Sequence, residues 1–221
     1  FFRREIPNLP ERGKYGVGMT FLPRDKNVAE QCRRIVESDA AEEGLEVFFW
    51  RDVPVVLSAI GPMALESRPE IVQFFVRGAK GEDSAAFERS LYILRRRIEK
   101  DIDSNTAAGD AFYICTLSCR TIVYKGLLNA PQLRKFFPDL ADPEYRSAIA
   151  LVHQRYSTNT FPTWQLAQPF RYLAHNGEIN TLRGNLNQMR SREAHFESPL
   201  FGEDIKNCLL YTSDAADEAR S

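Results

Sequence analysis

Long apolar runs are missing from this 221-residue chain, and cysteine is scarce. No stretch approaches the roughly 20 apolar residues that a membrane-spanning helix needs, which excludes such a helix within the chain. The four cysteines stand at positions 32, 115, 119 and 208, too few for a disulfide-dense scaffold, so we expect reduced thiols. If Cys115 and Cys119 share one strand, they lie on the same face but far apart, and we interpret both as small core residues.

An excess of charge of one sign is also lacking. Lys and Arg number 29 against 30 Asp and Glu, which gives a formal net charge of -1. No global field therefore recruits nucleic acid or an anionic membrane, and we predict neither as a partner. Two basic clusters, 33–34 and 95–97, fall in helix-periodic segments that also carry acids, so we interpret them as solvated helix faces.

An initiator methionine is absent, since the chain begins Phe1-Phe2. We therefore expect an interior piece of a longer protein, with any targeting signal upstream. With 43% hydrophobic residues the chain is long enough to bury a substantial core, as one large domain or two small ones.

The N-terminal quarter has clear strand and helix patterns. Residues 15–22 alternate as a strand does, and Gly16 and Gly18 predict a close approach to the backbone on one face. A helix is predicted over 28–43, because an Asn-x-x-Glu capping pattern precedes it and Gly44 follows it at the usual position of a left-handed cap.

Two more strands and a strongly amphipathic helix follow. Residues 45–50 and 70–77 are predicted strands, joined by an irregular connection that the prolines at 54, 62 and 69 prevent from being one helix. A helix that begins near Ser84 is predicted from apolar residues at intervals of four, three and four, namely Phe87, Leu91, Leu94 and Ile98.

The middle of the chain is rich in strand patterns. Residues 111–117 and 120–125 are predicted to form an antiparallel pair, because only two residues separate two aromatic and β-branched runs. A short helix over 131–136, an apolar strand over 148–152 and a strand over 170–174 follow. Strands outnumber helices and are often adjacent in sequence, which indicates an α+β fold with a largely antiparallel sheet.

Arg155 is the first candidate functional residue, directly after the apolar run that ends at Val152. A guanidinium can hold a carboxylate through two parallel hydrogen bonds, although a structural ion pair is the common role of a lone arginine. Ser157, Thr158 and Asn159 come next, and their short polar groups would either complete a carboxylate pocket or cap a turn.

Asn176 and Gly177 form the second candidate element, after the predicted strand 170–174. An Asn-Gly pair is first of all a turn signal. It can also supply a side-chain amide and an unobstructed backbone N–H that point at a developing oxyanion. His153 and His175 are weak evidence for zinc without further ligands at suitable spacing, and we expect His195 at the surface.

A resemblance to a known family rests on three motifs, HQRYSTN at 153–159, FPTW at 161–164 and HNGEINTLRGN at 175–185. Together they resemble the type 2 glutamine amidotransferase domain of glutamate synthases. Several type 2 amidotransferases share the HxRxST and HNG elements, whereas the extended third motif is similar to glutamate synthases in particular. The similarity covers nearly all of residues 1–207, including the stretches 15–25, 50–54 and 112–128.

The resemblance implies an α+β fold of the N-terminal-nucleophile hydrolase type, a four-layer α-β-β-α sandwich, here incomplete at both ends. It implies that glutamine is hydrolysed and that the ammonia passes to a distant synthase site, which makes glutamate from 2-oxoglutarate. FMN and an iron–sulfur cluster would belong to other domains of the same polypeptide, with none in this segment. A small reductase subunit or ferredoxin is an implied partner, and the implied location is the cytoplasm, or a plastid in a photosynthetic eukaryote.

Residue by residue, the resemblance implies that Arg155 holds the substrate α-carboxylate, that Asn176 and Gly177 form the oxyanion hole and that 157–159 shape the pocket. The chain departs from the family at its start, where Phe1 stands in place of a nucleophilic cysteine whose own amino group is the base. We therefore expect residues 1–207 to be an internal fragment that is inactive alone. An acidic residue that holds the substrate amino group in relatives would fall beyond residue 207.

The last residues, 208–221, are unlike the rest of the chain. The stretch CLLYTSDAADE can be encoded by DNA that resembles a sequencing-library transposase adapter read in frame, so we expect a non-native tail rather than a biological acidic segment. Two alternatives to the main hypothesis stay open. One is another type 2 amidotransferase, and the other is a non-catalytic glutamine-binding module.

Overall fold

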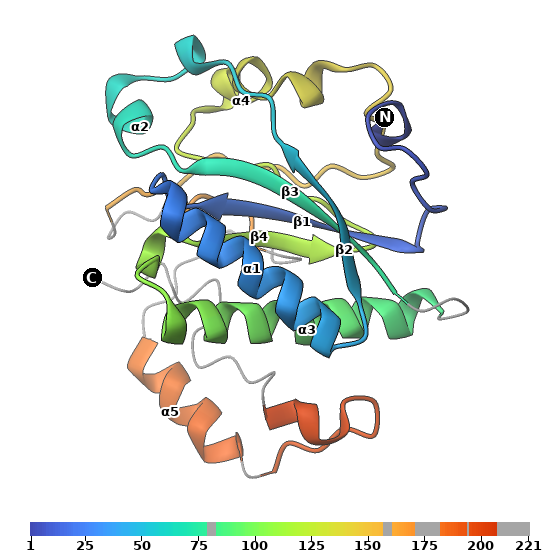
Figure 1. Cartoon of the computed structure of the whole chain (residues 1–221). Coiled ribbons are helices and arrows are strands. Elements are labelled where there is room, and N and C mark those ends of the chain that lie inside the picture. Colours follow the sequence, from blue (N-terminus) through green and yellow to red (C-terminus); the bar gives the residue numbers. More distant parts are fainter. Residues whose placement is uncertain (79–82, 157–160, 171–181, 194, 207–221) are drawn as a thin grey trace.

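A computed structural model describes residues 1–78, 83–156, 161–170, 182–193 and 195–206. Its centre is an antiparallel sheet of four strands in the order β2-β3-β1-β4 (Figure 1). The strands are β1 (Tyr15–Leu22), β2 (Glu46–Asp52), β3 (Glu70–Arg77) and β4 (Tyr113–Ser118). All four strands were predicted from the sequence, and the antiparallel sheet is confirmed.

Two long helices cover one face of the sheet, α1 (Lys26–Glu42) and α3 (Ser84–Asn105) (Figure 1). Each begins at an aspartate, Asp25 or Asp83, whose carboxylate accepts hydrogen bonds from two backbone N–H groups of the first turn. The helix predicted over 28–43 is therefore confirmed, with Asp25 rather than Asn27 as its cap. Gly44 has φ of +70°, as expected after the helix end.

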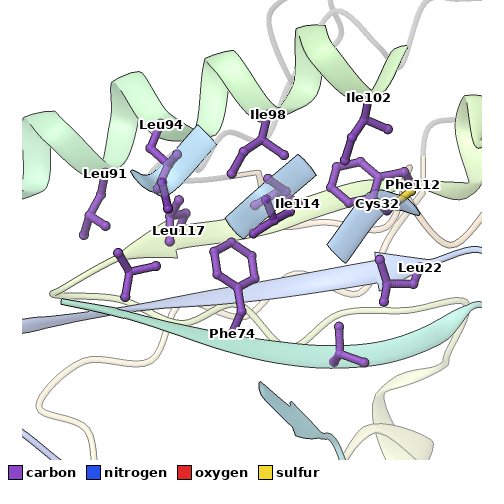
Figure 2. Packing of buried hydrophobic residues seen from close by; sticks show 14 of the residues in the cluster. Leu22, Cys32, Phe74, Leu91, Leu94, Ile98, Ile102, Phe112, Ile114 and Leu117 are labelled. Atoms are coloured by element: carbon purple, nitrogen blue, oxygen red, sulfur yellow. The ribbon is translucent and has the colours of Figure 1, made fainter. Parts of the chain in front are cut away.

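The core between helices and sheet explains why these elements form. The four apolar residues predicted along α3 are all buried, and they meet side chains of β1, β3 and β4 (Figure 2). A Cβ added at Gly18 would lie 2.2 Å from Cε1 of Phe74, and one at Gly16 would lie 2.6 Å from Cδ1 of Leu91. The predicted close approach at both glycines is confirmed, because neighbouring side chains occupy the space beside the strand.

Irregular chain covers the opposite face of the sheet, together with α2 (Pro62–Glu66) and α4 (Ala130–Phe136) (Figure 1). A second core there includes Met19, Phe21, Phe136, Phe137 and Trp164. The short 3-10 helices are η1 (Phe2–Arg4), η2 (Leu57–Ala59), η3 (Gly109–Ala111), η4 (Pro138–Ala141) and η5 (Gly202–Lys206).

The prediction that 120–125 pairs with β4 as a hairpin is wrong, because these residues form no strand. Side chains of β4 accept the backbone donors of this segment instead. Ser118 Oγ accepts from Arg120 N at 3.0 Å and from Thr121 N at 3.2 Å, and Thr116 Oγ1 accepts from Val123 N at 3.1 Å. The chain therefore turns back beside β4, held by hydroxyl groups rather than by a β-ladder.

A β-bulge in β4 changes the packing of Cys115, which lies in the strand, and of Cys119, which follows its end. The register of β1 with β4 shifts between Met19 and Thr20, so that Ile114 and Leu117 both enter the helix-side core. Cys115 is buried in the core on the other face, whereas Cys119 packs against the helix side. Their role as packing residues is confirmed, but the expectation that both lie on one face is wrong.

Residues 148–152 form no strand either, and three of their apolar side chains are exposed, Ile149 at 84%, Leu151 at 49% and Val152 at 71%. An apolar run becomes a strand only where another strand supplies hydrogen-bond partners and a covering layer. Neither is supplied to 148–152 by the described residues, which is why the apolar run there did not form the predicted strand.

The last α-helix of the described residues, α5 (Leu182–Glu193), lies beyond α3 and away from the sheet (Figure 1). His195 follows it and is exposed, as predicted. One basic cluster differs from its prediction, since the Arg95 side chain is only 5% exposed and pairs with Glu99 at 2.7 Å. No helix in the described ranges has the length and apolarity to cross a bilayer.

Candidate functional site

Arg155 is exposed, and its backbone rather than its guanidinium is held locally. The Arg155 N–H donates to Nδ1 of His153 at 3.3 Å, so the imidazole closes a tight turn over three residues. The side chain is therefore presented to solvent, where it could bind an anionic group of a ligand. Its predicted position after a strand is not observed, because 148–152 is irregular.

Tyr156, the next residue, faces into the protein. Its hydroxyl donates to the carbonyl oxygen of Gly126 at 3.0 Å, and burial raises the pKa of this hydroxyl. Arg155 and Tyr156 are thus neighbours in sequence with opposite environments, one side chain exposed and the other half-buried. The Tyr156 hydrogen bond therefore fixes the main chain directly after the exposed Arg155 side chain.

Lys125 is a buried cation beside this contact, 2% exposed. Its Nζ donates to the Gln165 carbonyl at 2.8 Å and to the Tyr113 hydroxyl at 3.2 Å. The same nitrogen lies 4.4 Å from the ring centroid of Tyr113 and 4.3 Å from that of Phe170. Lys125 therefore ties the segment after β4 to both the sheet and the segment 165–170.

The other predicted site residues cannot be placed against these. Ser157, Thr158, Asn159, Asn176 and Gly177 lie outside the described residues. The predicted strand 170–174 is described only at Phe170, which forms a β-bridge. Whether the two motifs meet remains a prediction.

A shallow pocket of about 290 Å³ lies between α2 and the FPTW motif. It is mainly apolar, and its lining residues include Met63, Glu66, Leu127, Phe161 and Trp164. The Trp164 indole N–H donates to the Ala64 carbonyl at 3.2 Å, which fixes one wall of the pocket against α2. The motif that contributed to the sequence resemblance is thus partly structural, since its tryptophan is a buried core residue.

A buried ionic network lies elsewhere, around Arg51 on β2. The Arg51 guanidinium binds Asp139 through two hydrogen bonds of 2.7 and 2.8 Å, and it also pairs with Glu5. Gln73 and the Tyr124 hydroxyl complete the network. Burial alone would lower the pKa of Arg51, but the bonds to Asp139 and Glu5 outweigh burial and raise it. Because these groups satisfy one another's hydrogen bonds, we interpret the network as stabilising the fold.

The described cysteines do not behave as nucleophiles. Burial raises the pKa of the Cys115 thiol to about 11, and burial with a hydrogen bond to Glu88 raises that of Cys119 to about 12. Burial also raises the pKa of Cys32. A nucleophilic thiol needs a depressed pKa, so these three are packing groups.

A metal centre is not supported by the donor set. Among the ranges that the structure describes, no three His, Cys, Asp or Glu side chains form a group that could hold a metal ion. Cys32 and Cys115 lie in different cores, so they do not fit a shared iron–sulfur cluster.

Sequence reasoning missed Lys125, Gly126 and the inward role of Tyr156. The available signal was a lysine and a glycine inside the otherwise apolar run 122–128. A charged residue in such a run indicates either a turn or a buried charge with specific partners.

Comparisons with known proteins bear on this arrangement. A family model described as class-II glutamine amidotransferases matches residues 1–220. The chain is 47% identical to the glutamate synthase (NADPH) large chain of Azospirillum brasilense over 211 residues, which are 94% of this chain and 14% of the relative. It is 46% identical to the glutamate synthase (NADPH) large chain of Bacillus subtilis (strain 168) over 224 residues, 99% of this chain and 14% of the relative. It is 50% identical to the chloroplastic ferredoxin-dependent glutamate synthase of Oryza sativa subsp. japonica over 191 residues, 86% of this chain and 12% of the relative.

Proposed function

Because the chain belongs to the class-II glutamine amidotransferases, we propose that it is part of the glutaminase domain of a glutamate synthase. The single observation that carries this proposal is the high identity to glutamate synthases from bacteria and a plant. The chain spans 14% or less of the length of these three relatives, so the activity of the whole protein is inferred rather than contained in this segment.

The proposed reaction is hydrolysis of the glutamine side-chain amide. The ammonia would pass to a synthase site elsewhere in the polypeptide, where 2-oxoglutarate becomes glutamate. FMN and an iron–sulfur cluster would supply the electron transfer there, in other domains of the polypeptide. A small reductase subunit or ferredoxin is the proposed electron source, and the cytoplasm or a plastid the proposed location.

Arg155 is proposed to bind the α-carboxylate of glutamine. Its exposure and the local hydrogen bond to its backbone support this role, since a ligand can reach the guanidinium while the main chain stays fixed. Ser157, Thr158 and Asn159 are proposed to shape the pocket. Asn176 and Gly177 are proposed to donate hydrogen bonds to the oxyanion that forms during attack on the amide.

The attacking sulfur is proposed to come from outside the described residues. The three described thiols have raised pKa values, and two of them are fully packed. We therefore expect the 221-residue chain alone to be inactive as a glutaminase. We also propose that 208–221 is a non-native tail and that 1–207 is the amidotransferase segment.

A second sheet, which would complete a four-layer α-β-β-α sandwich, is proposed to include residues 148–152. Their exposed apolar side chains support this, because burial of such side chains under a paired strand is favourable. In the complete polypeptide we expect the amide hydrogens of 148–152 to exchange more slowly than in the 221-residue chain. Hydrogen exchange measured by mass spectrometry tests this, and equal fast exchange in both would contradict the four-layer arrangement.

The test of the proposed function is an assay of the complete polypeptide for glutaminase and for 2-oxoglutarate-dependent glutamate formation. Arg155→Ala should raise the KM for glutamine, whereas Asn176→Ala should chiefly lower kcat. Arg146→Ala is the matched control, since this exposed arginine is nearby in sequence and has no proposed ligand role. Activity unchanged in Arg155→Ala and Asn176→Ala would refute the residue assignments.

The same assay separates the two alternatives. Glutamine hydrolysis with ammonia transfer to another acceptor, and none to 2-oxoglutarate, would indicate a different type 2 amidotransferase. Glutamine binding without hydrolysis would indicate a non-catalytic binding module.

A further inference from the structure

We propose that Tyr156 is a positioning residue for Arg155, and that buried Lys125 supports it. The inference rests on the proposed function, because Arg155 is there assigned to the substrate carboxylate. The observation behind it is the chain of contacts from Tyr156 through the segment 125–126 to the segment 165–170.

The first link is the hydrogen bond from the Tyr156 hydroxyl to the Gly126 carbonyl, 3.0 Å long and partly buried. A side chain adjacent in sequence to Arg155 is thereby fixed inside the protein. Since the guanidinium itself is exposed, the main chain at Tyr156 and the His153 contact set the point from which it extends. A shift of this point would move the guanidinium relative to any bound carboxylate.

The second link is the fixed position of the Gly126 carbonyl. A Cβ at Gly126 would lie 2.5 Å from Cζ3 of Trp164, so the backbone there lies directly against a buried indole ring. The same carbonyl accepts from Leu128 N at 2.8 Å, which closes a short turn. The acceptor of the tyrosine hydroxyl is therefore held by packing and by a second hydrogen bond.

The third link is Lys125, which joins this turn to the sheet and to the segment 165–170. Its ammonium contacts Tyr113 on β4, the Gln165 carbonyl and the Phe170 ring. Hydrogen bonds to a buried charged group are stronger than neutral ones, because the surroundings screen them less. Lys125 thus connects β4, the turn 125–128 and the segment 165–170, and keeps the Gly126 carbonyl in reach of Tyr156.

The experiment uses the complete polypeptide and two substrates, L-glutamine and L-glutaminamide. Glutaminamide carries the same side-chain amide but lacks the α-carboxylate. Tyr156→Phe should raise the KM for glutamine roughly two- to tenfold, the range that corresponds to one lost hydrogen bond, with kcat within about twofold. The kcat/KM for glutaminamide should stay unchanged, because that substrate offers Arg155 no carboxylate.

The control is Tyr15→Phe, a half-buried tyrosine at the start of β1, where neither substrate should be affected. In an Arg155→Ala background, Tyr156→Phe should have no further effect on glutamine, since the tyrosine acts through the arginine. Lys125→Met should raise the glutamine KM as Tyr156→Phe does, and Lys125→Arg should restore part of the loss by keeping the charge.

An equal effect of Tyr156→Phe on both substrates, or none on glutamine, would overturn the inference while leaving the proposed function intact. Circular dichroism checks the fold of the Lys125 variants, and the tyrosine variant keeps the test decisive if they misfold. If the wild-type protein hydrolyses neither substrate, calorimetry measures the Kd for glutamine instead. Tyr156→Phe should then raise this Kd, and Tyr15→Phe should leave it unchanged. Neither hydrolysis nor binding in the wild type would refute the proposed function and this inference together.

Discussion

Replacing Asp139 by asparagine should destabilise the fold far more than the matching change at an exposed carboxylate that also binds an arginine through two hydrogen bonds. Asp139 accepts two hydrogen bonds from Arg51 and one of 2.7 Å from the Tyr124 hydroxyl. The side chains of Arg51 and Asp139 are 6% and 3% exposed, so water cannot replace the lost partner. The asparagine amide would turn an N–H group towards either the guanidinium or the hydroxyl.

The magnitude follows from what remains around Arg51. Removal of one partner from a buried ion pair costs about 3–5 kcal/mol, because the other charge stays buried without compensation. Glu5 still pairs with Arg51, although its side chain is 41% exposed, so we expect the lower end, about 3 kcal/mol. That is a large share of a typical domain stability of about 5–15 kcal/mol.

The matched control is Glu46, which lies on β2, the strand that carries Arg51. Glu46 binds Arg77 through two bonds of 2.8 Å, but the side chains of Arg77 and Glu46 are 47% and 57% exposed. Glu46→Gln should therefore cost far less stability than Asp139→Asn, because water can solvate both partners of this exposed pair. Urea unfolding of the 221-residue chain, followed by circular dichroism and tryptophan fluorescence, gives both values.

The outcome that would refute this reasoning is a cost for Asp139→Asn no larger than that for Glu46→Gln. The double variant Arg51→Met/Asp139→Leu sharpens the test, because it removes both charges together. If the cost of Asp139→Asn is an uncompensated charge, the double variant should recover much of the lost stability.

Two further predictions concern packing and pH. Gly18→Ala should cost about 1–3 kcal/mol in urea unfolding, because its Cβ would overlap the Phe74 ring. Gly61→Ala should be nearly neutral, because the space beside Gly61 is open. Recovery of stability when Phe74→Leu is added to the Gly18→Ala chain would support this cause, and an equal cost at both glycines would contradict it. Burial and a neighbouring carboxylate raise the pKa of Asp39 to about 6. The folded state therefore binds the Asp39 proton more tightly than the unfolded chain does. The contribution of Asp39 to the free energy of unfolding is thus largest below about pH 4 and falls as the pH rises to about 6. Asp39→Asn should remove that fall, and parallel pH profiles for the two proteins would argue against it.

The sheet and its two long helices were predictable because their signals are local. The alternation over 15–22 and the apolar spacing along α3 each determine which side of one element is buried, and both elements find partners within the chain. Asp25 replaced Asn27 as helix cap, a difference of two residues of the kind that helix ends commonly show.

The failures have a different physical origin. Residues 120–125 have strand composition, but the hydroxyls of Ser118 and Thr116 accept N–H groups that a ladder would have used. The faces of Cys115 and Cys119 depend on a bulge opposite Met19 and Thr20, which strict alternation cannot reveal. Both outcomes depend on contacts between segments rather than on the pattern of either segment.

For the candidate site, the sequence identified candidate residues, and the structure added the contacts that surround Arg155. Arg155 was found from its chemistry and its motif, but nothing in its neighbours indicated that Tyr156 reaches Gly126 or that Lys125 is buried nearby. A substrate-binding arginine must be exposed to its ligand, so its precision has to come from residues around it. We assign that support to the turn 125–128, where the ammonium of Lys125 is hydrogen-bonded to the Tyr113 hydroxyl and to the Gln165 carbonyl.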